Sequence, residues 1–146
     1  MGDNVSVHSN DITNRRPNGD PDLAGTCIIL GSSETIVAEA SIKGNRIHRC
    51  GQMPRINREH GIYASRPRGA KITDNLIYDN ADRGIQLYPN PKGTLVEGNV
   101  VEATARTSSL AAAETTQPQT TPYAITWSPT HRLDGTYPVT GTLPAR

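Results

Sequence analysis

The sequence predicts an all-β solenoid, in which short strands stack in repeated coils. Three observations support this fold class. A phrase with aliphatic residues around one asparagine occurs four times, its aliphatic residues are mostly β-branched, and a phrase built around glycine recurs between the copies. β-Branched residues favour strands over helices. A single copy cannot bury its apolar side alone, whereas stacked copies can. The asparagines that mark the four copies are Asn10, Asn45, Asn75 and Asn99.

Each asparagine phrase reads aliphatic, two variable residues, Asn, one variable residue, aliphatic, as in Ile72–Ile77. We expect a strand before the asparagine, a turn at it and a second strand after it. The asparagines are 35, 30 and 24 residues apart along the chain. A stretch of that shortest length, at about 3.3 Å per residue, is enough for one turn of a flattened coil. The two longer intervals therefore indicate surface loops inserted at about 13–24 and 48–59.

The glycine phrase supplies a third strand for each coil. It occurs as Gly25–Ile29, Gly61–Ala64 and Arg83–Leu87, in the same order relative to the asparagine phrase. Its last copy alternates apolar and polar residues, which is the period of a half-buried strand. The predicted coil is therefore strand, asparagine turn, strand, loop, strand, and the chain has about three to four coils.

These phrases resemble the right-handed parallel β-helix repeat family, the pectate-lyase-like proteins. The resemblance covers about residues 4–102 and is carried by Asn45–Gly51, His60–Ser65, Ile72–Asn90 and Val96–Val101. In that family, turn asparagines of successive coils stack and hydrogen-bond to one another, as in other asparagine ladders. Asparagine suits such a corner because it tolerates left-handed backbone and its amide both donates and accepts. The resemblance implies an extracellular protein related to carbohydrate-active ones.

The composition changes after Glu102. Residues 103–146 are rich in Thr, Ala, Ser and Pro and contain no Asn. We therefore divide the chain into β-helix repeats at 1–102 and a disordered or irregular tail at 103–146, in which only Tyr123–Trp127 has the composition of a strand. Two origins of this tail stay open: the chain is a truncated β-helix that ends in unrelated sequence, or the tail is a native linker. The end coils expose unpaired strand edges, which predicts end-to-end self-association.

Charge and hydropathy exclude several classes of protein. With 15 basic and 14 acidic residues the chain has no basic footprint for nucleic acid. No apolar run is long enough to span a membrane. The first residues lack the basic and apolar regions of a secretory signal, so the extracellular location follows from the resemblance alone.

One outward face of the predicted coils carries groups that suit an acidic polysaccharide. Aligning the glycine phrases stacks Cys27, Tyr63 and Gln86 in one column, with His60 beside Arg83. The guanidinium would pair with a uronate carboxylate, and the imidazole or the phenol would move a proton. That chemistry is β-elimination or C5-epimerisation.

The candidate catalytic residues are His60, Tyr63 and Arg83, and the candidate substrate-binding residues are Glu59, Asp82, Gln86 and Tyr88. The alternative interpretation is that these side chains are polar only because they face water.

No metal or cofactor site is predicted. Calcium would need clustered carboxylates, and Asp74, Asp79 and Asp82 are spaced around a corner of the coil.

The alignment of the glycine phrases places Cys27 outward and Cys50 at a turn, so we expect both cysteines to be free thiols.

Three functions therefore stay open. The chain is part of a carbohydrate-active enzyme, a lyase or epimerase; or it is a non-catalytic structural, adhesion or carbohydrate-binding module; or it is a remnant without activity of its own.

Overall fold

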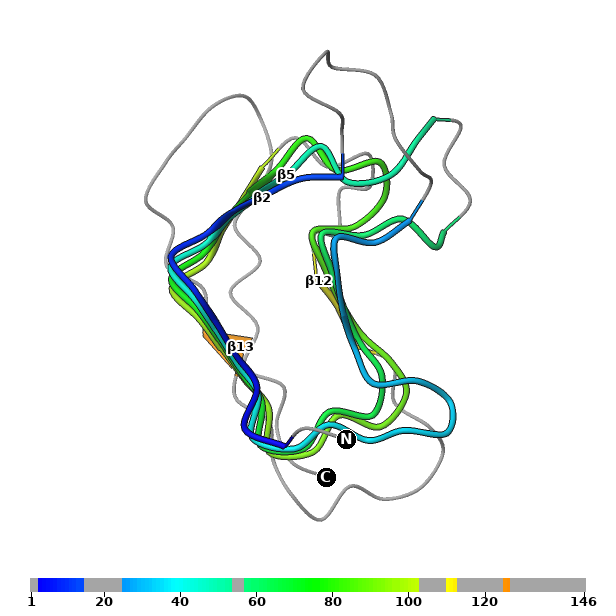
Figure 1. The fold of residues 1–146 in the computed structure, drawn as a ribbon, viewed down its shortest axis with the longest axis vertical. Helices are drawn as coiled ribbons and strands as arrows, with labels where there is room; N and C mark the ends of the chain where they lie inside the picture. Colours follow the sequence, from blue (N-terminus) through cyan, green and yellow to red (C-terminus); the bar gives the residue numbers. More distant parts are fainter. Residues whose placement is uncertain (1–2, 15–24, 54–56, 103–109, 113–124, 127–146) are drawn as a thin grey trace.

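The chain winds in coils around one core, and each coil adds a strand to each of three parallel sheets (Figure 1). The computed structural model describes residues 3–14, 25–53, 57–102, 110–112 and 125–126, and all regular structure in those ranges is β. Every strand pair is parallel, so neighbours in a sheet come from successive coils. The predicted fold class, a parallel β-helix, is confirmed.

Each sheet takes the same strand from every coil. The first sheet contains β1 (Ser6–His8), β4 (Ser41–Lys43), β7 (Lys71–Thr73), β10 (Leu95–Glu97) and β13 (Ile125–Thr126). The second contains β2 (Asp11–Ile12), β5 (Arg46–His48), β8 (Leu76–Tyr78) and β11 (Val100–Glu102). The third contains β3 (Ile28–Leu30), β6 (Ile62–Ala64), β9 (Ile85–Leu87) and β12 (Leu110–Ala112).

Two strands continue the sheets beyond Glu102. β12 pairs with β9, and β13 pairs with β10. The stacked strands thus run further along the chain than the asparagine and glycine phrases, which end at 102. The rest of the tail, at 103–109, 113–124 and 127–146, lies outside the described residues.

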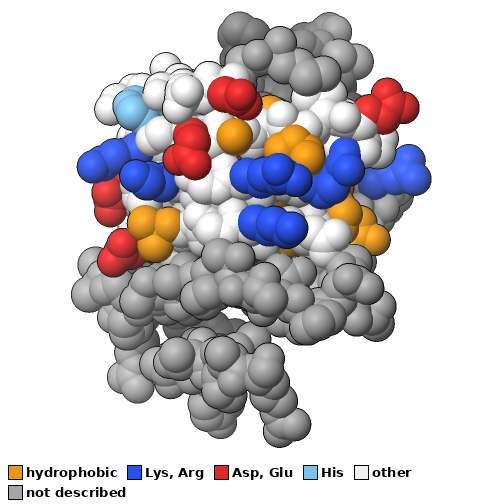
Figure 2. Space-filling view, turned by 90° about the horizontal axis from the view of Figure 1, so that it is seen from below, with side chains coloured by type: hydrophobic (Ala, Val, Ile, Leu, Met, Phe, Trp, Pro, Cys, Tyr) orange, Lys and Arg blue, Asp and Glu red, His pale blue; other side chains and the backbone are white. Residues whose placement is uncertain are grey.

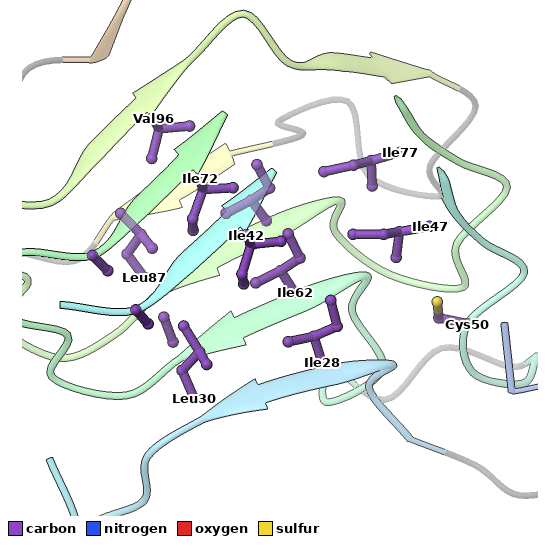
Figure 3. Close-up of a cluster of buried hydrophobic side chains, with 14 residues drawn as sticks. Ile28, Leu30, Ile42, Ile47, Cys50, Ile62, Ile72, Ile77, Leu87 and Val96 are labelled. Atoms are coloured by element: carbon purple, nitrogen blue, oxygen red, sulfur yellow. The ribbon is translucent and has the colours of Figure 1, made fainter. Parts of the chain in front are cut away.

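The core consists of aliphatic side chains stacked in columns (Figure 3). Each sheet points the same strand position inward in every coil, because strand register is fixed by the backbone pairing. Burying each of these side chains contributes roughly 1.5–3 kcal/mol relative to leaving it in water. The largest fully buried members are Ile42, Ile47, Ile62, Ile72, Ile77, Ile85 and Leu87.

The four asparagines form a ladder at the corner between the first and second sheets. The backbone N–H of Asn10 donates to Asn45 Oδ1 at 3.0 Å, that of Asn45 to Asn75 Oδ1 at 2.9 Å, and that of Asn75 to Asn99 Oδ1 at 3.0 Å. The side-chain amides are linked in the same order, Nδ2 to Oδ1, at 3.2, 2.9 and 2.8 Å. Each of the last three asparagines also donates through Nδ2 to a strand carbonyl of the preceding coil. The ladder therefore satisfies polar backbone that would otherwise be buried without partners.

The left-handed residue at this corner is not the asparagine. It is the residue before it: Ser9 (φ 56°), Gly44 (φ 64°), Asp74 (φ 57°) and Gly98 (φ 65°). The reason given above for asparagine is wrong in this respect, since the asparagine supplies the amide and its neighbour supplies the bend.

Candidate functional site

The outer face of the third sheet carries a column of three side chains in register. Ile29 pairs with Tyr63, and Tyr63 pairs with Gln86. The strand residues on either side of each point into the core, so the middle residue points outward. Ile29 is 61% exposed, and Tyr63 and Gln86 are half-buried. The sequence alignment placed Cys27 in this column; the structure places Ile29 there.

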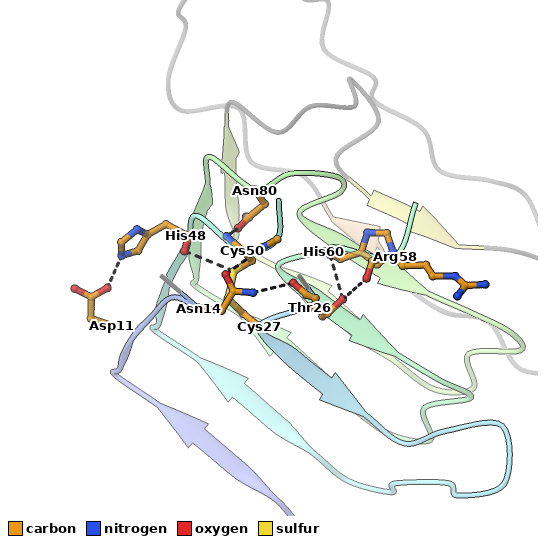
Figure 4. The surroundings of a disulfide bond; sticks show 11 residues. Asp11, Asn14, Thr26, Cys27, His48, Cys50, Arg58, His60 and Asn80 are labelled. Carbon is orange, nitrogen blue, oxygen red and sulfur yellow. Dashed lines mark hydrogen bonds and ion pairs between the residues drawn. A yellow bond between two sulfur atoms is a disulfide. The ribbon is translucent and has the colours of Figure 1, made fainter. Parts of the chain in front are cut away.

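Cys27 lies two residues earlier and forms a disulfide with Cys50 (Figure 4). Its backbone N–H donates to the His60 carbonyl at 3.1 Å, which puts Cys27 in register with Gly61 rather than Tyr63. The prediction of free thiols is therefore wrong. It failed because Gly25 was aligned with Gly61, and that shifted Cys27 from an inward position to an outward one.

The disulfide lies at the corner between the second and third sheets. Cys50 occupies the turn position of Asn80, whose Oδ1 accepts from the Cys50 N–H at 3.0 Å. In the neighbouring coil, Asn14 Oδ1 accepts from the Gly51 N–H at 3.1 Å. The middle rung of this corner thus has a cysteine among asparagines, and the disulfide fastens the first coil to the second.

His60 is held inside this corner. It is 2% exposed. Its backbone N–H donates to Thr26 Oγ1 at 3.1 Å, and its ring Nδ1 accepts from the Arg83 backbone N–H at 3.3 Å. With Nδ1 accepting, a neutral imidazole carries its proton on Nε2. Its ring lies 6.1 Å from the Tyr63 ring, centroid to centroid. The structure therefore brings His60, Tyr63 and Arg83 together, but only Tyr63 and Arg83 reach the outer face.

The Arg83 guanidinium lies along the outer column. Its Nη1 donates to Asn57 Oδ1 and, at 3.5 Å, to Gln86 Oε1. Tyr88, which is 44% exposed, follows β9 on the same coil. Aromatic, amide and guanidinium groups are thus presented together on rigid strands, an arrangement that can bind a polar, ring-shaped ligand.

The two predicted carboxylates face the other way. Glu59 is 2% exposed and Asp82 is 0% exposed. Glu59 Oε2 accepts from the Gln52 N–H at 2.9 Å, which closes the loop after β5. The Asp82 N–H donates to the Glu59 carbonyl at 3.0 Å, so the two residues stack on adjacent rungs. A ligand on the outer face would not touch either carboxylate in this arrangement.

A second polar cluster on the outer face of the second sheet was missed as a site. Asp11 Oδ1 is 2.7 Å from His48 Nε2, Asp11 forms an ion pair with Arg46, and the His48 ring stacks on Tyr78 with centroids 4.9 Å apart. The hydrogen bond from Arg46, then that from His48, lowers the pKa of Asp11 to about 2. Counting one and three residues from each ladder asparagine aligns these positions, so the sequence contained the signal.

The described residues contain no group of three His, Cys, Asp or Glu side chains arranged to hold a metal. In those same ranges, no helix has the length and apolarity needed to cross a membrane.

Comparison with known proteins identifies one relationship. The family model described as "Right handed beta helix region" matches residues 1–120. No curated protein and no solved structure matched the chain.

Proposed function

The chain belongs to the right-handed beta helix family, and on that premise we propose that it binds polysaccharide across the outer face of its third sheet. One observation carries the proposal: Ile29, Tyr63 and Gln86 stand in register on successive coils, with the Arg83 guanidinium hydrogen-bonded to Gln86. The apolar face of a sugar ring packs on an aromatic ring, and its hydroxyls bond to amides and guanidinium groups.

The geometry supports binding better than catalysis, since of the two predicted proton-transfer groups only the Tyr63 phenol reaches the outer face. A lyase or epimerase needs a proton acceptor at the substrate. His60 is buried, and one of its ring nitrogens is occupied by the Arg83 backbone N–H. Glu59 and Asp82 are buried as well. Of the predicted residues, Tyr63, Arg83, Gln86 and Tyr88 remain as ligand contacts, while His60, Glu59 and Asp82 shape the sheet beneath them.

We infer an oxidising compartment for the mature protein from the disulfide. Structural disulfides persist in secreted and periplasmic proteins and are rare where thiols are kept reduced. The Cys27–Cys50 bond thus supports an extracytoplasmic location independently of the family. Mass spectrometry of the native protein with a thiol-alkylating reagent tests this, since labelling of both cysteines would contradict it.

The binding proposal is tested with a panel of neutral and uronate polysaccharides, using the full 146-residue chain. We expect Tyr63→Ala to weaken binding by roughly tenfold, the loss expected for one stacked ring, and Tyr63→Phe to retain most of it. Tyr78→Ala is the matched control, because Tyr78 stacks on His48 on the second sheet. Equal binding by all four proteins would refute the site. Release of unsaturated oligosaccharides by the wild type would instead favour catalysis.

A further inference from the structure

The outer face of the first sheet holds a histidine and a serine that are hydrogen-bonded to each other. His8 lies on β1 and Ser41 on β4, and His8 Nε2 is 2.8 Å from Ser41 Oγ. Their strand neighbours Val7 and Ile42 pack in the core, so both polar side chains point outward. Within the described part of the chain, the His8 ring forms no other hydrogen bond.

Both residues are held on paired strands rather than on loops. The Ser41 backbone N–H donates to the Val5 carbonyl at 2.8 Å, which joins β4 to β1. The His8 carbonyl accepts from Asn10 Nδ2 at 2.8 Å, so the first amide of the ladder holds the strand at the histidine. A pair built on strands keeps its geometry better than one built on loops.

A hydroxyl beside an imidazole is the arrangement that activates a serine nucleophile. In the neutral tautomer with its proton on Nδ1, His8 Nε2 accepts from the Ser41 hydroxyl and can take its proton. Ser41 also pairs in register with Lys71 on the next coil, at the spacing of neighbouring strands, about 4.8 Å. An ammonium group anchored there can stabilise negative charge that develops beside Ser41 Oγ.

Ser6 shows what distinguishes Ser41 from an ordinary surface serine. The two serines are register partners in the same outward column. Ser6 is exposed on β1, the first strand of the sheet, whereas Ser41 is half-buried between β1 and β7. The histidine bonds to the hydroxyl of Ser41. Ser6 therefore provides an internal reference for the reactivity of Ser41.

The surroundings of the pair suit a small substrate. Its nearest outward neighbours in register are Ser6, Lys43 and Lys71, which are all polar. Figure 2 views the adjoining side, which carries the turns from the third sheet to the first, and the apolar side chains there are scattered among Lys, Arg, Asp and Glu. A long acyl chain would gain little burial on such a surface, so a short one is expected.

We propose that Ser41 is a catalytic nucleophile with His8 as its general base, and that the pair hydrolyses small carboxylic esters. Ser41 Oγ attacks the carbonyl carbon, and its proton passes to His8 Nε2 while Lys71 holds the charge on the carbonyl oxygen. The bond to the leaving alcohol then breaks, and the alcohol oxygen takes the proton from His8. Water attacks the acyl group on Ser41 by the same route, which releases the acid and restores the hydroxyl.

The test is labelling of the 146-residue chain with a fluorophosphonate, which forms a stable ester with activated serines, followed by peptide mass spectrometry. We expect the label at Ser41 and not at Ser6. His8→Gln should slow the labelling roughly 10²-fold, the low end for loss of a general base. Lys71→Gln should slow it roughly two- to fivefold, because an exposed charge is screened by water.

Turnover is measured as hydrolysis of p-nitrophenyl acetate. Ser41→Ala should remove the turnover, and the matched control Ser6→Ala should keep it. All these residues lie on the outer face, so the variants should unfold at the wild-type temperature. If His8→Gln is destabilised, added imidazole still separates the roles, because it should restore labelling of Ser41 in His8→Ala only where the histidine acts as a base.

Three results would each overturn the proposal: no label at Ser41, equal labelling of the two serines, or labelling of His8→Gln at the wild-type rate. The pair lies on the first sheet and the polysaccharide face on the third. Failure of the ester reaction therefore leaves the binding proposal intact, and loss of polysaccharide binding leaves the ester reaction to be judged by Ser41 alone.

Discussion

The two corners that flank the second sheet both contain hydrogen-bonded asparagines, but they differ in how constant the connection between the strands is. At the corner between the first and second sheets, two residues always join the strands, and an asparagine on every described coil bonds to the next. At the corner between the second and third sheets, the connection varies from Thr13–Cys27 to Asp79–Gly84. The first corner we call the ladder corner and the second the variable corner.

The difference shows where a solenoid can change without losing its fold. A constant turn keeps each amide above the last, so the ladder corner fixes the register of the coils. The variable corner keeps asparagines at 14 and 80 but has Cys50 between them, bonded to Cys27. There a covalent bond replaces an amide rung, and the loops are free to differ.

Removing a central ladder amide should have the largest effect. Asn75→Ala removes the acceptor of the Asn45 backbone N–H and of the Asn45 side-chain amide, and it removes one donor to the Ile42 carbonyl. Each unpaired buried group costs about 1–3 kcal/mol, so we expect the free energy of unfolding to fall by roughly 3–5 kcal/mol. Urea denaturation measures this.

Asn10→Ala serves as the control at the end of the ladder. Asn10 is exposed, and its side-chain Nδ2 donates to Asn45 Oδ1 and to the His8 carbonyl. The cost there should be well below that at position 75. Equal costs at the two positions would show that the contribution of a ladder asparagine to stability does not depend on its burial.

Loss of the disulfide should rank second. Cys27→Ala/Cys50→Ala should reduce the free energy of unfolding by about 2–4 kcal/mol, because the unfolded chain is no longer constrained. The comparison of corners suggests a replacement: Cys27→Gly/Cys50→Asn copies Gly61 and Asn80 of the next coils.

That replacement should be more stable than the alanine pair, because the new amide oxygen can accept a backbone N–H from the preceding coil, as Asn80 Oδ1 accepts from Cys50. Thermal unfolding of both variants, with the reduced wild type alongside, decides the matter. A replacement no better than the alanine pair would mean that the variable corner cannot hold a ladder at this rung.

The sequence predicts the ladder corner well and the variable corner poorly, for a physical reason. A two-residue turn places Asn45 and Asn75 at the same point of each coil, so a short phrase is enough to find both. Between Asn10 and Ile28, an inserted loop brings Gly25 to a place that resembles Gly61, and the register slips by two residues. One such slip exchanged the inward Cys27 with the outward Ile29.

The burial of the candidate site residues could not be predicted from the sequence immediately around them. The register of His60 with Arg83 could be predicted from the glycine phrase, and the structure has it. That His60 and Glu59 are covered depends on Thr26 and Gln52, which come from elsewhere in the loops. Asp11 and His48 could have been aligned from the ladder, because each follows a ladder asparagine at a fixed spacing. Asp11 comes one residue after Asn10, and His48 comes three residues after Asn45.

The glycines of the two corners should respond differently to substitution. Gly61 lies where there is no room for a side chain, because an added Cβ would lie 2.7 Å from the Gly84 carbonyl oxygen and 3.1 Å from Asn80 Nδ2. We expect Gly61→Ala to cost about 1–3 kcal/mol through overpacking. Gly44 provides a left-handed bend (φ 64°), with only Ser9 Oγ near a Cβ, at 3.8 Å.

Gly44→Asn should therefore cost less than about 1 kcal/mol, because asparagine tolerates left-handed backbone, and Asp74 already occupies the equivalent position. Denaturant midpoints of the two variants give the comparison. A costly Gly44→Asn beside a harmless Gly61→Ala would reverse the roles assigned to the corners.

The smallest expected effect concerns the sheet between the corners and appears only in acid. Arg46 and His48 lower the pKa of Asp11 from 3.8 to about 2, so folding favours the ionised carboxylate. The stabilisation is fully present above pH 3.8 and is lost as the pH falls toward 2. The difference in unfolding free energy between the wild type and Asp11→Asn should accordingly be constant near neutrality and shrink over that acid range. Because the pair is exposed, high salt should reduce the difference as well. A difference that stays the same through the acid range would show that Asp11 acts through packing or neutral hydrogen bonds, and that only the corners hold the coils in register.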